Sequence, residues 1–341
     1  MTSPLTPTPL MDLTLGIYAF KALALATELE LFTELAGGVS TTLAGFAARH
    51  RIDERPAELL LTGLVSLDLL RLDNDGTYSN TPVAEEYLVK GKPRYFGGWV
   101  TLVDKHEYPA YINMRDSLLG NRPYTWDVEN QTSLFQPDDP VVKEHFWDAM
   151  HSLSAYTAAQ LAEHFDFSSI KTLLDVGGGG AAYDIELCNR HPHLKSTVFD
   201  LPFVCELTKP RVQKAGLADR ISFASGDFFE VGGVPGGYDA ILLSNILHDW
   251  GIEDARKILR SCAEALPSGG VILITESFVD DDKRGPAPAA LMSLNMLVET
   301  WGRNYTAAEY SAWMEEFGLK PEGITPFEGQ GANGVLVARK P

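Results

Sequence analysis

Glycine and aspartate residues in the second half of the chain occur at spacings that suit a ligand-binding site. Residues 173–180 read LLDVGGGG, so an apolar run ends in Asp175 and passes directly into glycines. Glycines let the backbone turn sharply and approach a ligand closely, because no Cβ intervenes. Asp200 ends the next apolar run, 21 residues beyond Gly179, at the spacing of a carboxylate that binds ribose hydroxyls. We therefore expect an adenosine-containing ligand, although an aspartate at a strand end also caps turns.

Two later motifs supply groups that could bind adenine and accept a proton. In residues 225–229, SGDFF, the carboxylate of Asp227 could accept from an adenine amino group while the neighbouring rings cover its face. In residues 247–250, LHDW, His248 is the side chain best suited to general-base catalysis near neutral pH. A hydrogen-bonded structural histidine is the alternative. Residues 177–182 also satisfy the G-x-G-x-x-A fingerprint, which leaves an NAD-dependent dehydrogenase open.

The elements that must position these motifs alternate between strands and helices. Strands are expected at residues 172–176, 195–200, 221–224, 238–244, 270–276, 322–327 and 334–339. This alternation predicts a mainly parallel, doubly wound α/β sheet, in which ligands bind at the carboxyl ends of the strands. The four motifs fall at those ends.

The first part of the chain is mostly helical by its pattern and begins with a Pro- and Thr-rich arm that we expect to be loose. Apolar spacing predicts three helices, at 13–35, 41–50 and 55–69. An Asp-Asn-Asp-Gly turn between two short extended runs then predicts a hairpin at 70–79. This order is that of a winged helix. Because these helices lack a basic stripe, packing or dimerisation is favoured over DNA binding.

An aromatic-rich stretch at 95–147 and one long helix at 139–167 connect the two parts. Most of these aromatic side chains are expected to be interdomain core, and some should line a pocket. We therefore expect a helical, winged-helix dimerisation and substrate-lid domain at 1–155, followed by a Rossmann-like domain at 156–341.

Composition excludes several classes of protein. The 341 residues include 28 Lys and Arg against 46 Asp and Glu, a net charge of -18 that would repel nucleic acid and anionic membranes. Three scattered cysteines fit a reducing cytoplasm rather than a disulfide framework. We find no signal peptide and no apolar run near the ~20 residues of a membrane span. The histidines lack a carboxylate or cysteine cluster at ligand spacing, so no metal site is expected.

With DVGGG, FDLP, GDFF and LHDW in this order, the chain resembles the S-adenosylmethionine (SAM)-dependent O-methyltransferases of small molecules typified by the caffeate and acetylserotonin enzymes. The resemblance covers nearly the whole chain. It implies a class I methyltransferase domain, SAM as cofactor, a small-molecule acceptor and a homodimer. The expected cofactor-binding residues are Asp175, Gly177, Gly179, Asp200, Leu201, Gly226, Asp227, Phe228 and Ser244.

The same resemblance implies roles in catalysis and acceptor binding. His248 would be the general base, and Glu276, at the end of a strand, would orient its ring. The expected acceptor-binding residues are Phe146, Met150, Ser154, Tyr108, Tyr111, Asn295 and Glu299.

Three departures from the family pattern bear on the acceptor. Gly180-Ala181 replaces a common Thr-Gly, Ser244 replaces a lysine of the plant enzymes, and Asn304 aligns with the second acidic partner of the base, a role that Glu299 could take over. O-methylation is the first expectation. The alternative is S-methylation of a small thioether acid such as 4-methylthio-2-hydroxybutyrate, which leads to dimethylsulfoniopropionate in marine bacteria and has no proton to remove.

Overall fold

The computed structural model describes residues 5–131, 134–135, 140–329 and 331–341, with the side chains of 140–145 excepted. The chain forms two compact units, Met1–Lys105 and His106–Pro341. The expected boundary at residue 155, between a dimerisation and substrate-lid domain and a Rossmann-like domain, stays a proposal.

The first unit combines helices with a small antiparallel sheet. Its three strands have the order β1-β3-β2, and the turn between β2 and β3 is closed by a hydrogen bond from Gly76 N to Asp73 O. Phe32, Phe46 and Leu61 are among its fully buried side chains. Its elements are α1 (Thr8–Glu28), α2 (Leu31–Glu34), η1 (Ala36–Gly38), β1 (Thr41–Thr42), α3 (Leu43–His50), α4 (Glu54–Ser66), β2 (Leu70–Leu72), β3 (Thr77–Asn80), α5 (Pro82–Tyr87) and α6 (Gly97–Leu102), and the π-helix η2 (Val103–Glu107) passes into the second unit.

Helix α1 corrects two expectations. It begins at Thr8, inside the arm expected to be loose, because prolines are tolerated in the first turn of a helix. It ends at Glu28 rather than near residue 35, since Glu30 adopts a left-handed φ of 54° before α2 begins. By length and composition α1 could also cross a membrane, with a mean hydropathy of 1.4 over a window that is 17% buried. This helix contains no uninterrupted apolar run of that length, because Asp12 and Lys21 interrupt it.

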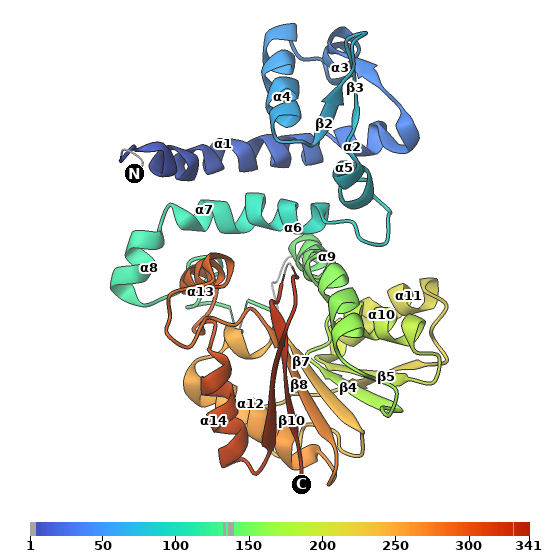
Figure 1. Ribbon diagram of the computed structural model, residues 1–341, viewed down its shortest axis with the longest axis vertical. Helices are drawn as coiled ribbons and strands as arrows, with labels where there is room; N and C mark the ends of the chain where they lie inside the picture. The colour runs from blue at the N-terminus through green and yellow to red at the C-terminus, as the bar shows by residue number, and fades with distance from the viewer. Residues whose placement is uncertain (1–4, 132–133, 136–139, 330) are drawn as a thin grey trace. The chain divides into compact units, whose positions relative to one another are not determined.

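The second unit is a seven-stranded sheet with helices on both faces (Figure 1). The strand order is β6-β5-β4-β7-β8-β10-β9; β4 to β8 are parallel, and β10 is antiparallel to both of its neighbours. The chain moves outward from β4 to β6 and returns to β7 beside β4, so a switch point with its ligand crevice lies between β4 and β7. The strands are β4 (Thr172–Val176), β5 (Lys195–Asp200), β6 (Ile221–Ser225), β7 (Ala240–Ser244), β8 (Val271–Glu276), β9 (Lys320–Pro326) and β10 (Gly334–Arg339).

Two apolar layers hold the helices to the sheet because successive strand residues point to opposite faces. Leu173 and Leu242 pack with α9, α10 and α11, whereas Leu174 and Leu243 pack with α12 and α14. The helices of this unit are α7 (Tyr108–Tyr111), α8 (Met114–Gly120), α9 (Pro140–His164), α10 (Ala182–Arg190), α11 (Pro202–Lys214), η3 (Leu247–Asp249), α12 (Ile252–Ala265), α13 (Ala287–Glu299) and α14 (Ala307–Glu316).

The predicted α/β class with a mainly parallel sheet is confirmed. Strands β4, β5 and β10 have the predicted bounds; β6, β7 and β8 differ by one or two residues at one end, and β9 begins two residues and ends one residue earlier than predicted. The single long helix expected at 139–167 is α9.

Candidate active site

The glycine loop after β4 packs closely against neighbouring side chains and adopts backbone conformations that favour glycine. Gly177 has a φ of 72°, and a Cβ there would lie 2.3 Å from Ile246 Cδ1. Gly179 has a φ of 49°, and its Cβ would lie 3.0 Å from a ring carbon of Trp147. Gly177 N donates to Phe199 O at 2.8 Å and fixes the turn. The loop therefore presents backbone rather than side chains at the switch point, as a bound ligand requires.

Asp200 joins this loop to the end of β5. Its Oδ2 accepts from Gly179 N at 2.9 Å and its Oδ1 accepts from Leu201 N at 2.7 Å. Burial raises the pKa of Asp200 to about 6, although both backbone hydrogen bonds lower it. Each carboxylate oxygen keeps a second lone pair, which fits the paired hydroxyls of a ribose.

Asp175 lies beneath the loop and is paired with an acid that the sequence interpretation missed. Its side chain is only 2% exposed and interacts with the fully buried Asp184 of α10, which also accepts from Ser196. Burial, followed by the charge of Asp184, raises the pKa of Asp175 well above its usual range. A Cβ at Gly178 would lie 2.9 Å from Asp175 Oδ2, so the carboxyl of Asp175 lies directly against the glycine loop.

The residues expected to bind adenine lie after β6 and β7. Asp227 Oδ1 accepts from Phe229 N at 2.8 Å, and the ring of Phe228 packs edge-on against Trp250 with centroids 5.8 Å apart. Gly226 N donates to the backbone oxygen of Asp200 at 3.1 Å, which links this loop to the residue expected to bind the ribose. Ser244 ends β7 beside the phenol of Tyr183.

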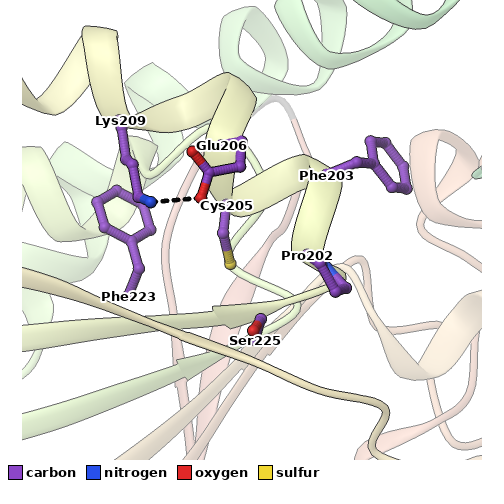
Figure 2. A pocket seen from close by; sticks show the side chains of 7 residues that line it. All are labelled: Pro202, Phe203, Cys205, Glu206, Lys209, Phe223 and Ser225. Atoms are coloured by element: carbon purple, nitrogen blue, oxygen red, sulfur yellow. Dashed lines mark hydrogen bonds and ion pairs between the residues drawn. The ribbon is translucent and has the colours of Figure 1, made fainter.

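Figure 2 shows a hollow of about 380 Å³ between α11 and β6. It adjoins Leu201 and Gly226 in sequence but contains none of the predicted site residues. Its lining is Pro202, Phe203, Cys205, Glu206, Lys209, Phe223 and Ser225.

A histidine and a glutamate meet where β7 and β8 end. His248 Nδ1 lies 2.9 Å from Glu276 Oε2, a contact whose alignment lies outside ordinary hydrogen-bond geometry. The other oxygen of Glu276 accepts from Ile246 N at 3.1 Å and from Leu247 N at 3.0 Å. Because Glu276 is 1% exposed and held by two amides, its carboxylate is fixed in position beside Nδ1 of His248.

Asp249 is a second acidic neighbour of this histidine, which the sequence interpretation did not assign. Its Oδ1 lies 3.5 Å from His248 Nε2. Burial lowers the pKa of His248, but the charges of Glu276 and Asp249 outweigh it and raise this pKa to about 9. Burial raises the pKa of Asp249 to about 7, against the effect of His248. His248 is therefore mostly protonated at neutral pH and becomes a base as the pH rises.

Several residues expected to bind the acceptor form one polar network. The hydroxyl of Tyr111 lies 2.6 Å from Asn295 Oδ1 and 3.0 Å from Glu107 Oε2. Glu107, which the sequence interpretation missed, interacts with Glu299, and the charge of Asp249 raises the pKa of Glu299. This network therefore reaches the neighbourhood of His248.

The remaining expected acceptor residues lie on α9 and α7. Phe146, Met150 and Ser154 follow one another at intervals of four residues, so they share one face of α9. Phe146 is buried and packs edge-on against Phe135. Tyr108 is half-buried at the start of α7.

Asn304 does not act on His248 in the way its alignment suggested. Its Nδ2 donates to Ser277 O at 2.6 Å, and the acidic groups that act on His248 are Glu276 and Asp249. Glu299 is not among the groups that shift the pKa of His248. In the described part of the chain, no group of three or more His, Cys, Asp or Glu side chains could hold a metal ion.

Comparison with known proteins agrees with this geometry. Residues 115–320 match the O-methyltransferase domain, and residues 11–90 match the O-methyltransferase dimerisation domain. The chain is 46% identical to the 3-hydroxy-5-methyl-1-naphthoate 3-O-methyltransferase of Streptomyces sahachiroi over 98% of this chain and 95% of that protein. It is 32% identical to the tetracenomycin polyketide synthesis 8-O-methyl transferase of Streptomyces glaucescens over 98% and 97%. The solved structure of human N-acetylserotonin methyltransferase in complex with SAM superposes with a TM-score of 0.87, at 28% identity and 100% and 99% coverage.

The doubly wound sheet, glycine loop and His–Glu pair define a class I methyltransferase. The chain belongs to the family of SAM-dependent O-methyltransferases. This membership rules out the dehydrogenase alternative.

Proposed function

We propose that the chain transfers a methyl group from SAM to a hydroxyl oxygen of a small molecule, with His248 as the general base. The observation that carries the proposal is the His248–Glu276 contact of 2.9 Å, held at the carboxyl end of the sheet by two backbone amides. A base is needed because an attacking hydroxyl must lose its proton as the new C–O bond forms. The thioether alternative gains no support, since a thioether has no proton for this pair to accept.

The residues around the switch point fit the cofactor. The backbone of the loop at Gly177 and Gly179 would receive the methionine part, and Asp200 with the Leu201 segment would hold the ribose. Gly226, Asp227, Phe228 and Ser244 would bind the adenine, and Asp175 would act indirectly by supporting the loop. When bound, SAM supplies an activated methyl group, so the protein mainly aligns the partners and removes a proton.

The residues on the acceptor side divide between orientation and proton removal. The shape of the acceptor site would be set by Phe146, Met150 and Ser154 on one face of α9, together with Tyr108. The acceptor's polar groups would be held by Tyr111, Asn295 and Glu299. Glu276, whose Oε2 lies 2.9 Å from His248 Nδ1, would favour the tautomer with its proton on Nδ1, so that Nε2 could accept the hydroxyl proton. The resulting imidazolium is stabilised by Glu276 and Asp249.

We also propose that the chain is a homodimer assembled through α1. Apolar side chains in α1 and just before it are strongly exposed on a single subunit, among them Leu5, Leu10, Met11, Leu13, Leu15, Ile17 and Tyr18. An apolar surface of this kind is typical of a protein interface, and residues 11–90 match a dimerisation domain. In this proposal residues 1–155 assemble the dimer and cover the pocket, residues 156–341 bind SAM, and the acidic chain is cytoplasmic and binds neither nucleic acid nor membrane.

The proposal is tested by incubating the protein with SAM and hydroxylated one- and two-ring aromatics, small hydroxy acids and thioether acids. Product masses identify the methylated compound, and calorimetry with S-adenosylhomocysteine (SAH) and with NAD measures cofactor binding. We expect SAH binding, no NAD binding, and O-methylation that is lost in His248→Ala. Methyl transfer to thioethers alone would overturn the proposal.

A further inference from the structure

Side chains from two helices hold the backbone oxygens of the glycine loop. His151 Nδ1, on α9, lies 3.0 Å from the backbone oxygen of Gly180. On α11, the buried hydroxyl of Thr208 donates to the backbone oxygen of Gly179 at 2.7 Å. Arg211, also on α11, donates to the backbone oxygen of Gly180 over a longer distance of 3.4 Å. The shorter of the two hydrogen bonds to Gly180 therefore comes from α9.

The imidazole of His151 is neutral and acts as the donor in this contact. Burial and the positive charge of Arg211 lower its pKa to about 3, although the hydrogen bond to Gly180 raises it. A neutral imidazole has a single N–H, and a backbone oxygen can only accept. The N–H must therefore be on Nδ1, so His151 is a donor to the loop and not a proton carrier at neutral pH.

The close approach of α9 to the loop depends on the absence of a side chain at Gly180. A Cβ there would lie 2.9 Å from His151 Cβ and 2.6 Å from Arg211 Nη1. The threonine that is common at this position would need still more of that space. One turn earlier on α9, Trp147 lies against the loop in the same way, 3.0 Å from where a Cβ of Gly179 would be. The departure from the family pattern at Gly180 thus provides the room in which His151 reaches the loop.

The loop needs such support because the backbone next to Gly180 is strained. Ala181 has a φ of 56°, in the left-handed region that a residue with a Cβ rarely adopts. Its N–H donates to the backbone oxygen of Gly178 at 2.9 Å, and its side chain is fully buried. A strained conformation persists only where the surrounding contacts fix it. We therefore expect the loop to relax if the backbone oxygen of Gly180 loses its donor.

Helix α9 also carries residues that are proposed to shape the acceptor site. Phe146, Met150 and Ser154 share one of its faces, and His151 directly follows Met150. The hydrogen bond to Gly180 therefore joins the loop proposed to receive the methionine part of SAM to the helix proposed to contact the acceptor. The relative position of the two matters, since a displacement of about 1 Å can lower the rate about 10²-fold.

We propose that His151 is a positioning residue for methyl transfer, which fixes the glycine loop to α9 through the backbone oxygen of Gly180. It acts through the loop, and so sets both the affinity for the cofactor and the direction of the methyl group toward the acceptor. A loop that has relaxed in the free protein must be restored when the cofactor binds, and this cost appears as weaker binding. The inference adds a residue to the proposed function and rests on it for the methyl-transfer readout alone.

The test compares His151→Asn with His151→Leu, two replacements of nearly the same shape. Asn keeps an N–H donor at the position of Nδ1, whereas Leu keeps only the bulk. Calorimetry measures SAH binding, and kcat is measured at saturating SAM with a hydroxylated compound that the wild-type protein methylates. We expect His151→Leu to weaken SAH binding about tenfold, because a buried acceptor loses its donor, and to lower kcat about tenfold or more. His151→Asn should stay within about threefold of the wild-type protein in both.

The matched control is His164→Leu on the same helix. Its Nδ1 lies 2.9 Å from the backbone oxygen of Gln160, one turn earlier in α9. This variant should keep the wild-type SAH affinity and kcat. If His151→Leu fails to fold, which circular dichroism would reveal, His151→Ala takes its place and should show the same losses.

The outcomes separate this inference from the proposed function. If the wild-type protein methylates no hydroxylated compound, the proposed function fails, while the SAH affinities of the variants still decide the inference. If His151→Leu only lowers the Tm and keeps the SAH affinity and kcat, the histidine is merely structural and the inference is wrong. The inference is also wrong if His151→Asn and His151→Leu are impaired equally, because the donor then makes no difference. Losses in His151→Leu that His151→Asn restores support it.

Discussion

Glu276→Gln should change both the pH dependence and the rate of methyl transfer. In the wild-type protein the pKa of His248 is raised to about 9, so only about 1% of it is neutral at pH 7. A base acts in its neutral form, and kcat/KM should therefore rise with pH and level off above about 9. The variant removes one of the two charges that raise this pKa, while burial still lowers it. We expect the rise of kcat/KM with pH to move by about 2 pH units or more toward acid.

The plateau rate of this variant should fall as well. The amide N–H of the new side chain would face His248 Nδ1 and favour the tautomer whose proton sits on Nε2, where the base must accept. A loss of about 10²–10⁴-fold is expected for a misdirected base. The assay is kcat/KM from pH 6 to 10.5 with saturating SAM, and Glu322→Gln, an exposed acid paired with Arg339, is the control. If kcat/KM of Glu276→Gln rises over the same pH range as that of the wild-type protein, the reasoning is refuted.

Three further predictions concern the cofactor and assembly. Asp200→Asn should weaken SAH binding by about 5- to 150-fold, because an anionic acceptor for the ribose is lost. The affinity of the wild-type protein should fall as the pH drops below about 6 and Asp200 takes up a proton. Calorimetry from pH 5 to 8 measures both effects, and a wild-type affinity that does not change with pH would contradict this role. Gly177→Ala should abolish measurable SAH binding, because its Cβ would lie 2.3 Å from Ile246 Cδ1 at a φ of 72°; unchanged affinity would be inconsistent with the loop geometry. Leu13→Glu should convert the dimer to a monomer in light scattering, whereas Val231→Glu, on a fully exposed side chain of the other unit, should not; a wild-type monomer at micromolar concentration would exclude the dimer.

The sheet could be predicted from the sequence because its strands are buried and sharply bounded. Strand β4 is an apolar run that ends in glycines, and β5 ends where Pro202 begins the next helix, so both limits carry local signals. The end of α1 carries none. Glu30 takes a left-handed conformation without glycine or proline nearby, and the apolar pattern continues through it.

The sequence prediction names candidate site residues that stand in motifs and misses those that depend on a partner distant in sequence. Asp200 and His248 end strands or begin turns in recognisable motifs. Glu107 and Asp184 have no motif, because each gains its significance from a carboxyl that folding brings to it. Asp249 lay inside a quoted motif, yet only its 3.5 Å contact with His248 indicates that it helps to set the pKa of the base.

The most direct test of His248 as general base compares His248→Ala with the wild-type protein on two phenols of similar shape. One has a pKa of about 10, like tyrosine, and the other carries a nitro group and is already ionised at the assay pH. For the first, the variant should lose about 10²–10⁴-fold in kcat/KM, because no group remains to accept the proton. For the ionised phenol there is no proton to remove, so the loss should be much smaller. An equal loss on both phenols would contradict the assignment of His248 as the base.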